Sequence, residues 1–349
     1  MLARWRVRSM DSTGYRSDTK ILNRARHLLS EMTAQHPASR ARASSPVLDL
    51  GRDGCATKRG TALSLMVLAR PWQWIKNGLV LAALIFSHRL FVPHDAIFAG
   101  VAFVAFCALS SFAYVLNDIS DREADRLNPE KRDRPLACGD LTIAQAACFA
   151  VALGAIATLL SIALGLNFLA IAALYVALQF GYSLWAKQYV VLDVIAVASG
   201  FVLRAFGGAV AIGVEVSPWL AFITFVLAML LVLGRRRHEL VAMGDGAARH
   251  RGVLSQYSLR LIDQMLAIVA GATLISYMIY TASAEVEAKL GTHYLYLTVP
   301  FVAFGILRYL YLVDERDEGG DPSRLLIRDR PLLITVLLWI AADIALLYF

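Results

Sequence analysis

The stretch NDISDREAD, residues 117–125, carries an amide and three carboxylates at helical spacing. Asn117, Asp121 and Asp125 are four residues apart, and Asp118 lies three residues before Asp121, so a continuous helix would place all four on one face. Carboxylates aligned in this way repel each other unless a cation lies between them. Mg²⁺ is the natural candidate, because it prefers carboxylate oxygens and completes its shell with water and substrate phosphates. We therefore predict a magnesium site with these four residues as ligands.

A basic cluster follows the carboxylates after a few residues. Lys131, Arg132 and Arg134 lie between Pro129 and Pro135. Metal-binding carboxylates beside basic residues are typical of a pocket for a phosphorylated ligand that arrives with Mg²⁺. The alternative is a solvated loop whose charges only fix topology. That alternative gives no reason for the one-face spacing, and Asp contributes little to the orientation of a membrane protein.

The segments that must position these residues are long and apolar. The 349-residue chain is 58% hydrophobic and 17% charged, which is typical of a helical membrane protein. We expect an all-α polytopic membrane protein with about nine transmembrane helices. The predicted spans are 71–88, 96–116, 142–163, 167–183, 190–213, 217–233, 264–282, 293–312 and 331–349.

Basic residues are unevenly distributed among the loops between these spans. With a cytoplasmic N terminus, Arg89 and Lys289 are the only Lys and Arg residues in the outside loops. The loops expected on the inside, which hold nearly all the other basic loop residues, are 117–141, 184–189, 234–263 and 313–330. This distribution follows the positive-inside rule and predicts that the acidic motif faces the cytoplasm.

The surplus positive charge of the chain is concentrated at its start. Residues 1–60 hold 12 Lys and Arg against 5 Asp and Glu, a net charge of +7 that equals the value for the whole chain. We expect these residues to form a basic extension that is disordered or lies on the anionic membrane surface. A dispensable extension is the alternative. Residues 61–349 are expected to form the membrane domain.

The acidic motif also carries a family resemblance. NDISDREADRLNPEKRDRPLACG resembles the first Asp-rich motif of the UbiA superfamily of intramembrane prenyltransferases, NDxxDxxxD followed by a basic Arg-Pro and a Gly. The resemblance covers about residues 64–349. It implies a UbiA-like bundle of nine helices around a central cavity, with Asp118, Asp121 and Asp125 handling Mg²⁺ and a diphosphate. Residues 61–349 would then be the catalytic domain.

The chain departs from this superfamily at the end of the sixth predicted span. Quinone-type members carry a second Asp-rich motif, DxxxD, where this sequence reads LVLGRRRHEL. With one acidic cluster we expect one Mg²⁺-diphosphate site. Arg235, Arg236 and Arg237 suit an anion that arrives without its own metal, such as a monophosphate. Positive-inside anchoring is the alternative for this triplet.

Two further stretches, RPWQWIKN (70–77) and YSLWAKQYVVLD (182–193), resemble a phosphoribosyltransferase subgroup that acts on decaprenyl-type phosphates. In this subgroup phosphoribosyl diphosphate is the electrophile, and the polyprenyl phosphate attacks carbon one of the ribose. The products are polyprenyl-phosphoryl-5-phosphoribose and diphosphate, and the sugar serves arabinan precursors of the cell wall, as in arabinogalactan. A phosphate monoester is already an anion at neutral pH, so the nucleophile needs no general base. The resemblance implies a bacterial inner membrane.

The expected site combines catalytic and substrate-binding residues. Lys76 joins the three aspartates as a catalytic residue and contacts donor phosphates. The residues expected to bind substrate are Asn77, Asn117, Arg122, Lys131, Arg132, Arg134, Tyr182, Lys187, Arg235, Arg236 and Arg237. Arg204 lies deep in the fifth predicted span and should face the bundle interior, where a structural contact is at least as good an explanation as a substrate contact.

Two rival functions remain open from the sequence. One is a prenyltransferase that moves an isoprenyl group from its diphosphate to an aromatic or glyceryl acceptor. A second carboxylate pair near 234–245 would favour it, but only Glu239 and Asp245 are found there. The other is a non-catalytic lipid-binding or transport bundle, which gives no reason for the aligned oxygen ligands. The expected partners are phosphoribosyl diphosphate, polyprenyl phosphate, Mg²⁺ and membrane lipid, without nucleic acid; a homo-oligomer stays open.

Overall fold

The computed structural model describes residues 59–128, 131–243 and 252–349, and every regular element within them is a helix. The predicted N-terminal extension lies almost entirely outside these residues. The long helices are α4 (Pro93–Ser120), α7 (Ile143–Ala163), α8 (Leu166–Leu184), α9 (Leu192–Ala211), α10 (Pro218–Met243), α12 (Leu259–Ala282), α14 (Val299–Asp314) and α16 (Arg330–Tyr348). The short ones are α2 (Thr61–Ala69), η1 (Pro71–Leu81), α3 (Ala82–Phe86), α5 (Arg122–Leu127), α6 (Pro135–Cys138), η2 (Ala186–Gln188), η4 (Gly252–Gln256), α13 (Ala284–Leu290), η5 (Leu295–Thr298) and α15 (Pro322–Arg328).

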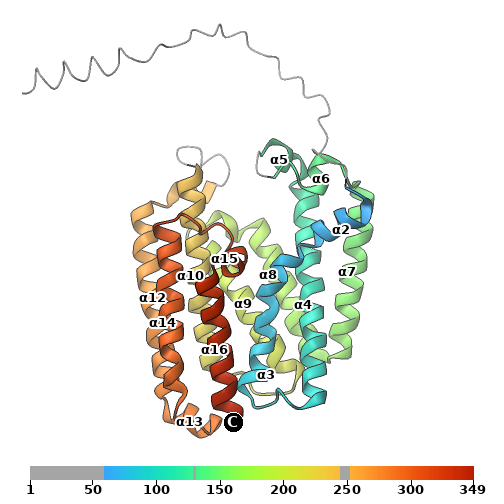
Figure 1. Cartoon of the computed structure of the whole chain (residues 1–349). Helices are drawn as coiled ribbons and strands as arrows, with labels where there is room; N and C mark the ends of the chain where they lie inside the picture. Colours follow the sequence, from blue (N-terminus) through green and yellow to red (C-terminus); the bar gives the residue numbers. More distant parts are fainter. Residues whose placement is uncertain (1–58, 129–130, 244–251) are drawn as a thin grey trace, which may run out of the picture. The chain divides into compact units, whose positions relative to one another are not determined.

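In the described part of the chain, eight helical segments are long and apolar enough to cross a membrane. The first predicted span, 71–88, is not among these eight and folds as the 3₁₀ helix η1 followed by the α-helix α3. Figure 1 shows this segment running from the end of the bundle that carries α2 to the end that carries α3. A 3₁₀ helix rises about 2.0 Å per residue against about 1.5 Å for an α-helix. The segment therefore reaches farther than an α-helix of the same length.

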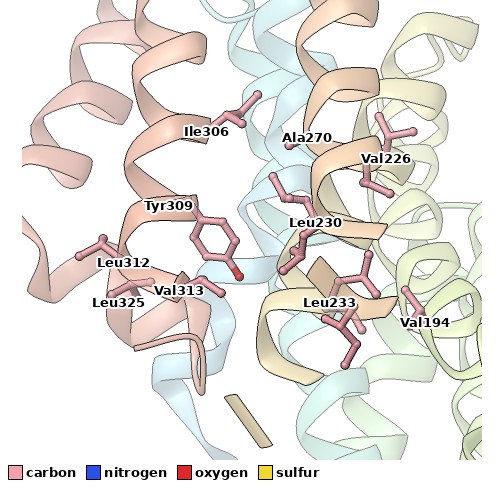
Figure 2. Close-up of a cluster of buried hydrophobic side chains, with 14 of the residues drawn as sticks. Val194, Val226, Leu230, Leu233, Ala270, Ile306, Tyr309, Leu312, Val313 and Leu325 are labelled. Atoms are coloured by element: carbon pink, nitrogen blue, oxygen red, sulfur yellow. The ribbon is translucent and has the colours of Figure 1, made fainter. Parts of the chain in front are cut away.

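One hydrophobic cluster holds α10, α12 and α14 together. Leu230 and Leu233 of α10 are buried against Ile262 of α12 and Tyr309 of α14. Figure 2 shows the Tyr309 ring directed toward α10, where its hydroxyl donates a hydrogen bond to the Leu231 carbonyl at 3.2 Å. Helix association in a bilayer depends on such packing and interhelical hydrogen bonds, because lipid tails are as apolar as the side chains.

Helix α9 packs closely on its neighbours through two glycines. A Cβ atom on Gly207 would lie 2.3 Å from the Phe106 ring of α4, and one on Gly208 would lie 1.9 Å from the Val80 carbonyl oxygen of η1. Small residues at helix interfaces allow this close backbone approach. The small residues around Arg204 thus fix η1, which carries Lys76, against α9.

Gly208→Ala should therefore destabilise the bundle. The new methyl group meets backbone atoms of Val80, which cannot rotate away, and overpacking of this kind costs about 1–3 kcal/mol. We expect a lower thermal unfolding midpoint in detergent, measured by intrinsic fluorescence. Gly271→Ala on α12 is the matched control, because a Cβ there has no neighbour within 4 Å. Equal midpoints for the two variants would contradict the proposed close contact.

Candidate active site

The acidic motif does not form the uniform helix predicted from its spacing. Helix α4 ends at Ser120 and α5 begins at Arg122, with Asp121 between them at φ −92° and ψ 4°. Backbone hydrogen bonds of 2.8 Å still run from Asp121 N to the Asn117 carbonyl and from Asp125 N to the Asp121 carbonyl. Asp118 and Asp125 are 4% and 3% exposed, whereas Asp121 is exposed. Asp118 and Asp125 are thus buried together, and a metal site shared with Asp121 stays a prediction.

Asp118 and Asp125 converge on a single guanidinium group. The Arg134 Nη1 atom lies 2.9 Å from Asp118 Oδ1 and 2.7 Å from Asp125 Oδ2. Arg70 Nη2 also lies 2.5 Å from Asp118 Oδ1, and Lys131 Nζ lies 3.9 Å from Asp125 Oδ1. The two buried carboxylates are thus close together, and their charges are compensated by cations from three separate positions in the chain.

The local backbone explains how the two arginines reach this point. Arg70 links α2 to η1 in the left-handed conformation, with φ 54° and ψ 58°, and its guanidinium lies over the Tyr114 ring. Arg134 is extended at φ −65° and ψ 142°, as expected for a residue before proline. Arg122 Nε donates a hydrogen bond to the Leu136 carbonyl at 3.2 Å. Arg122, predicted to bind substrate, therefore ties α5 to α6 in this structure.

The donor set can be compared with the needs of Mg²⁺. Within the described residues, no group of three or more His, Cys, Asp or Glu side chains is arranged to hold a metal ion. The Asp118 and Asp125 oxygens nevertheless converge on one small positive group, and they have the chemistry that Mg²⁺ prefers. Mg²⁺ commonly takes only one or two carboxylates and fills its shell with water and substrate phosphates. The two residues therefore fit an ion that arrives with a diphosphate.

Asn117 and Asn77, both predicted site residues, have their side chains engaged inside the protein. The Asn117 Oδ1 atom accepts a hydrogen bond from the Ser183 hydroxyl of α8 at 2.9 Å. Asn77 is fully buried, and its Oδ1 atom accepts from Arg204 Nε at 2.7 Å. Both amides link helices here.

Positive charges gather around Lys76 on η1. Its ammonium is only partly exposed, and the charges of Arg235, Arg204 and Arg70 act on it together with the opposing charge of Asp321. Such a concentration of cations in a low-dielectric setting attracts anions. Contact of Lys76 with a donor phosphate stays a prediction.

Helix α15 closes one side of this region. Asp321, which caps α15, accepts a hydrogen bond from Gln73 Nε2 of η1 at 3.0 Å. The Arg324 guanidinium lies over the Trp72 ring of the same 3₁₀ helix. Neither Gln73 nor Asp321 was predicted as a site residue, because their contact joins segments almost 250 residues apart. Arg70 was also missed, although it begins the RPWQWIKN motif.

The three arginines at 235–237 lie in different environments, and Arg236 is the most deeply buried of them. It is 2% exposed, and its Nε and Nη1 atoms bind Asp193 at 2.8 Å and Glu239 at 2.6 Å. Its Nη2 atom donates to the Tyr182 hydroxyl at 3.2 Å. Arg236 and Tyr182, both predicted to contact substrate, thus belong to a buried network that joins α8, α9 and α10.

Arg237 and Arg235 differ in their exposure. Arg237 pairs with Asp263, Asp314 and Asp317, which ties α10 to α12 and to the end of α14. Arg236 and Arg237 are each engaged by more than one carboxylate here, and contact of the triplet with a phosphate stays a prediction. Arg235, with 52% of its side chain exposed, pairs with Glu239 at 2.9 Å.

Two predicted residues lie on the connecting segments. Lys187 is partly exposed on η2, and Arg132 is exposed between α5 and α6. Their contact with a substrate stays a prediction.

Tyr257 completes the Arg236 network. Its hydroxyl donates to Asp193 Oδ1 at 2.9 Å and accepts from the Val191 backbone nitrogen at 2.7 Å. Val191 has a φ of 68°, which is unusual for a β-branched residue. Burial raises the pKa of Tyr257 from 10.0 to about 12, so the hydroxyl keeps its proton at neutral pH.

Tyr257→Phe should lower the free energy of unfolding by about 1–3 kcal/mol, because it leaves Asp193 Oδ1 and the Val191 N–H without this partner. Since the folded-state pKa lies above the ordinary value, the stabilisation is complete below pH 10 and is lost as the pH rises toward about 12. Thermal melts at pH 7 would measure the loss. The control Tyr296→Phe, at a side chain 53% exposed, should change stability by less than about 0.5 kcal/mol. Equal melts for both variants would contradict the network's role.

Comparison with known sequences gives one family match and several close relatives. The model of the UbiA prenyltransferase family matches residues 77–335. The decaprenyl-phosphate phosphoribosyltransferase of Corynebacterium glutamicum is 34% identical over 290 residues, which cover 80% of this chain and 85% of that protein. The protein of the same name from Mycolicibacterium smegmatis is 32% identical over 296 residues, covering 82% and 92% respectively.

The solved structures include a match to the whole helical bundle. The structure of a UbiA homolog from Archaeoglobus fulgidus, bound to DMAPP and Mg²⁺, has a TM-score of 0.62 and 20% sequence identity. The match covers 81% of this chain and 99% of that one. At this identity the likeness shows the fold, and it agrees with the predicted all-α bundle of about nine spans.

Proposed function

The chain belongs to the UbiA prenyltransferase family, and we propose that it transfers the 5-phosphoribosyl group of phosphoribosyl diphosphate to a polyprenyl phosphate of the decaprenyl type. The eight apolar helices of the described part, together with the family, make it a multi-pass membrane protein. Relatives named decaprenyl-phosphate phosphoribosyltransferase that match most of the chain support the choice of reaction.

The observation that carries this proposal is the amount of positive charge inside the bundle. Besides Arg134, which joins Asp118 and Asp125, Arg70 and Lys131 lie beside the same two carboxylates, and Arg204 is buried in α9. A prenyl diphosphate presents one diphosphate and an apolar chain. Phosphoribosyl diphosphate presents a diphosphate and a second phosphate on a polar sugar, and the acceptor adds another phosphate. A cluster of cations of this kind suits the more highly charged pair of substrates.

The chemistry follows from these charges. An oxygen of the acceptor phosphate forms a bond to carbon one of the ribose, and the bond from that carbon to the diphosphate oxygen breaks. Asp118 and Asp125 would hold Mg²⁺, which when bound neutralises charge on diphosphate. Arg134, Arg70 and Lys131 lie beside the two carboxylates and would stabilise the departing diphosphate. The nucleophile is already anionic, so no side chain has to remove a proton.

The proposed location is the inner membrane of a bacterium, with the α5 and α6 end of the bundle in the cytoplasm. The basic residues of the loops at that end support this orientation. Phosphoribosyl diphosphate is a charged, water-soluble donor, so a cytoplasmic opening gives it access. The lipid product would then supply arabinan precursors of the cell wall.

Transfer of radiolabelled phosphoribose into a lipid-extractable product tests the proposal. Purified protein, polyprenyl phosphate and Mg²⁺ should give labelled lipid, and omission of the acceptor or chelation of the metal should abolish it. A protein that leaves all label in the aqueous phase under the complete conditions would refute the function. A non-catalytic lipid-binding bundle gives that second result.

A further inference from the structure

Helix α15 is held at the membrane surface by the helix that follows it. It ends at Arg328, and α16, which is long and apolar enough to cross a membrane, begins at Arg330. Only Asp329 lies between the two helices, so α15 lies at the level where α16 passes from the headgroups into the hydrocarbon. Figure 1 shows α15 at this end of α16. Any face that α15 turns outward therefore meets lipid headgroups or water.

The residues of α15 separate into a buried face and an exposed face. Ser323 and Leu325 are each 4% exposed. By contrast, 65% of the Arg324 side chain is exposed, Ile327 is 55% exposed, and Arg328 is exposed as well. Arginines beside an exposed isoleucine are typical of a helix in the membrane interface, where the apolar side chain reaches the acyl chains and the guanidinium groups reach the phosphates.

Arg330 extends the exposed face of α15 onto α16. It is exposed and lies four, seven and eight residues before Ile334, Leu337 and Leu338, so these side chains share one face of the helix. The three apolar side chains are 54%, 56% and 51% exposed. An uncovered apolar face on a membrane-crossing helix meets lipid tails, and Arg330 lies at its headgroup end. The four residues Arg324, Ile327, Arg328 and Arg330 are called the cationic face below.

The carboxylate nearest in sequence to Arg328 and Arg330 is engaged elsewhere. Asp329 lies between them, but its Oδ2 atom pairs with Arg308 Nη2 at 2.7 Å. Its Oδ1 atom accepts a hydrogen bond from the Leu332 nitrogen at 2.9 Å, which caps α16. Within the part of the chain that the structure describes, no carboxylate pairs with Arg328 or Arg330. An anion from outside the protein can therefore pair with these two arginines.

Arg324 connects the cationic face to η1. Its guanidinium lies over the Trp72 ring, 5.4 Å from the ring centre. Asp321 lies 3.5 Å from Arg324 Nε, but it also accepts a hydrogen bond from Gln73 of η1 at 3.0 Å. Tryptophan is enriched at the membrane–water interface, so Trp72 agrees with the position that α16 gives to α15. The indole beside the cationic face is also a fluorescent reporter for it.

We propose that the cationic face binds the phosphate of an anionic phospholipid in the membrane leaflet at this end of the bundle. The guanidinium groups pair with the phosphodiester, and Ile327 lies against the first carbons of an acyl chain. The lipid is a component of the membrane and not a reactant, so this site goes beyond the proposed transfer reaction. Charge complementarity selects the partner, because a zwitterionic lipid brings its own cation with the phosphate and gains less from the arginines.

Quenching of tryptophan fluorescence by phosphatidylglycerol with brominated acyl chains tests this site on the purified full chain in a neutral detergent. The apparent dissociation constant should rise about fivefold in Arg328→Gln and about 25-fold in Arg324→Gln/Arg328→Gln, since each basic residue contributes about that factor at an anionic surface. Brominated phosphatidylcholine should bind more weakly, and about equally to the wild type and the double variant. In Trp72→Phe the saturable part of the quenching should be lost.

Arg260→Gln is the matched control, because it removes the same charge from an exposed position on the first turn of α12, at the same end of the bundle. It should weaken binding of phosphatidylglycerol less than about twofold.

Equal affinities of the wild type and the double variant would overturn the proposal. Equal weakening by Arg260→Gln and Arg328→Gln would also overturn it, because only the overall charge of this end would then matter. Saturable quenching that persists in Trp72→Phe would place the lipid away from α15. Displacement of phosphatidylglycerol by polyprenyl phosphate at a tenth of its concentration would assign the cationic face to the acceptor instead.

Discussion

Asp118→Asn should lower kcat/KM for phosphoribosyl transfer by about a thousandfold, equivalent to about 4 kcal/mol of transition-state stabilisation. Asp118 is 4% exposed, and its Oδ1 atom lies within 3 Å of both Arg70 and Arg134. The isosteric amide keeps the volume but removes the charge that would hold Mg²⁺. It also leaves two guanidinium groups with a neutral partner. Initial rates at increasing Mg²⁺ concentration measure the effect.

A carboxylate at the opposite end of the bundle provides the control. Glu285 is exposed on α13, and Figure 1 shows that α13 lies at the end away from α5 and α6. Glu285→Gln should leave the rate unchanged. If Asp118→Asn retained more than a tenth of the wild-type activity, a metal role for this residue would have to be abandoned.

Arg134→Gln should have two opposite effects. Transfer should fall about 100-fold, because Arg134 would stabilise the leaving diphosphate. Binding of a divalent ion to the substrate-free protein should strengthen about tenfold or more. Arg134 now compensates Asp118 and Asp125 together, and its removal leaves two close carboxylates that attract a cation. Titration with Mn²⁺, followed by its electron paramagnetic resonance signal, measures this second effect without any substrate.

Arg126→Gln is the matched control for the Arg134 variant. Arg126 belongs to the same segment, but it pairs with Glu123 and donates to the Ala137 carbonyl. It should change neither Mn²⁺ affinity nor transfer by more than about threefold. Unchanged Mn²⁺ affinity in Arg134→Gln would show that the guanidinium does not compete with the metal for the two carboxylates.

The fold class could be predicted because the length of an apolar segment is a local property. Nine segments long enough to cross a bilayer are visible in the sequence, and their uneven loop charges predict the orientation. The 3₁₀ form of residues 71–81 could not be predicted in this way. The segment packs on α9, where Val80 lies close to Gly208, and the two residues are far apart in the chain.

The candidate site was predictable in composition but not in geometry. The spacing argument assumed a continuous helix through Asp121, whereas α4 ends and α5 begins on either side of that residue, which is exposed while Asp118 and Asp125 are buried. The triplet at 235–237 looks uniform in the sequence. The different environments of the three arginines depend on partners such as Asp193 and Asp314, which only the tertiary structure brings near. Long-range ion pairs of this kind leave no periodic signal.

The choice of donor is the central claim, and one measurement tests it most directly. Purified protein is given labelled phosphoribosyl diphosphate or labelled geranylgeranyl diphosphate, each with Mg²⁺, polyprenyl phosphate and an aromatic acceptor, and consumption of both donors is followed in the same preparation. We expect diphosphate release and lipid labelling with phosphoribosyl diphosphate alone. Consumption of the prenyl donor with an inert phosphoribosyl donor would contradict the account, and it would assign the cation-lined interior to a prenyltransferase.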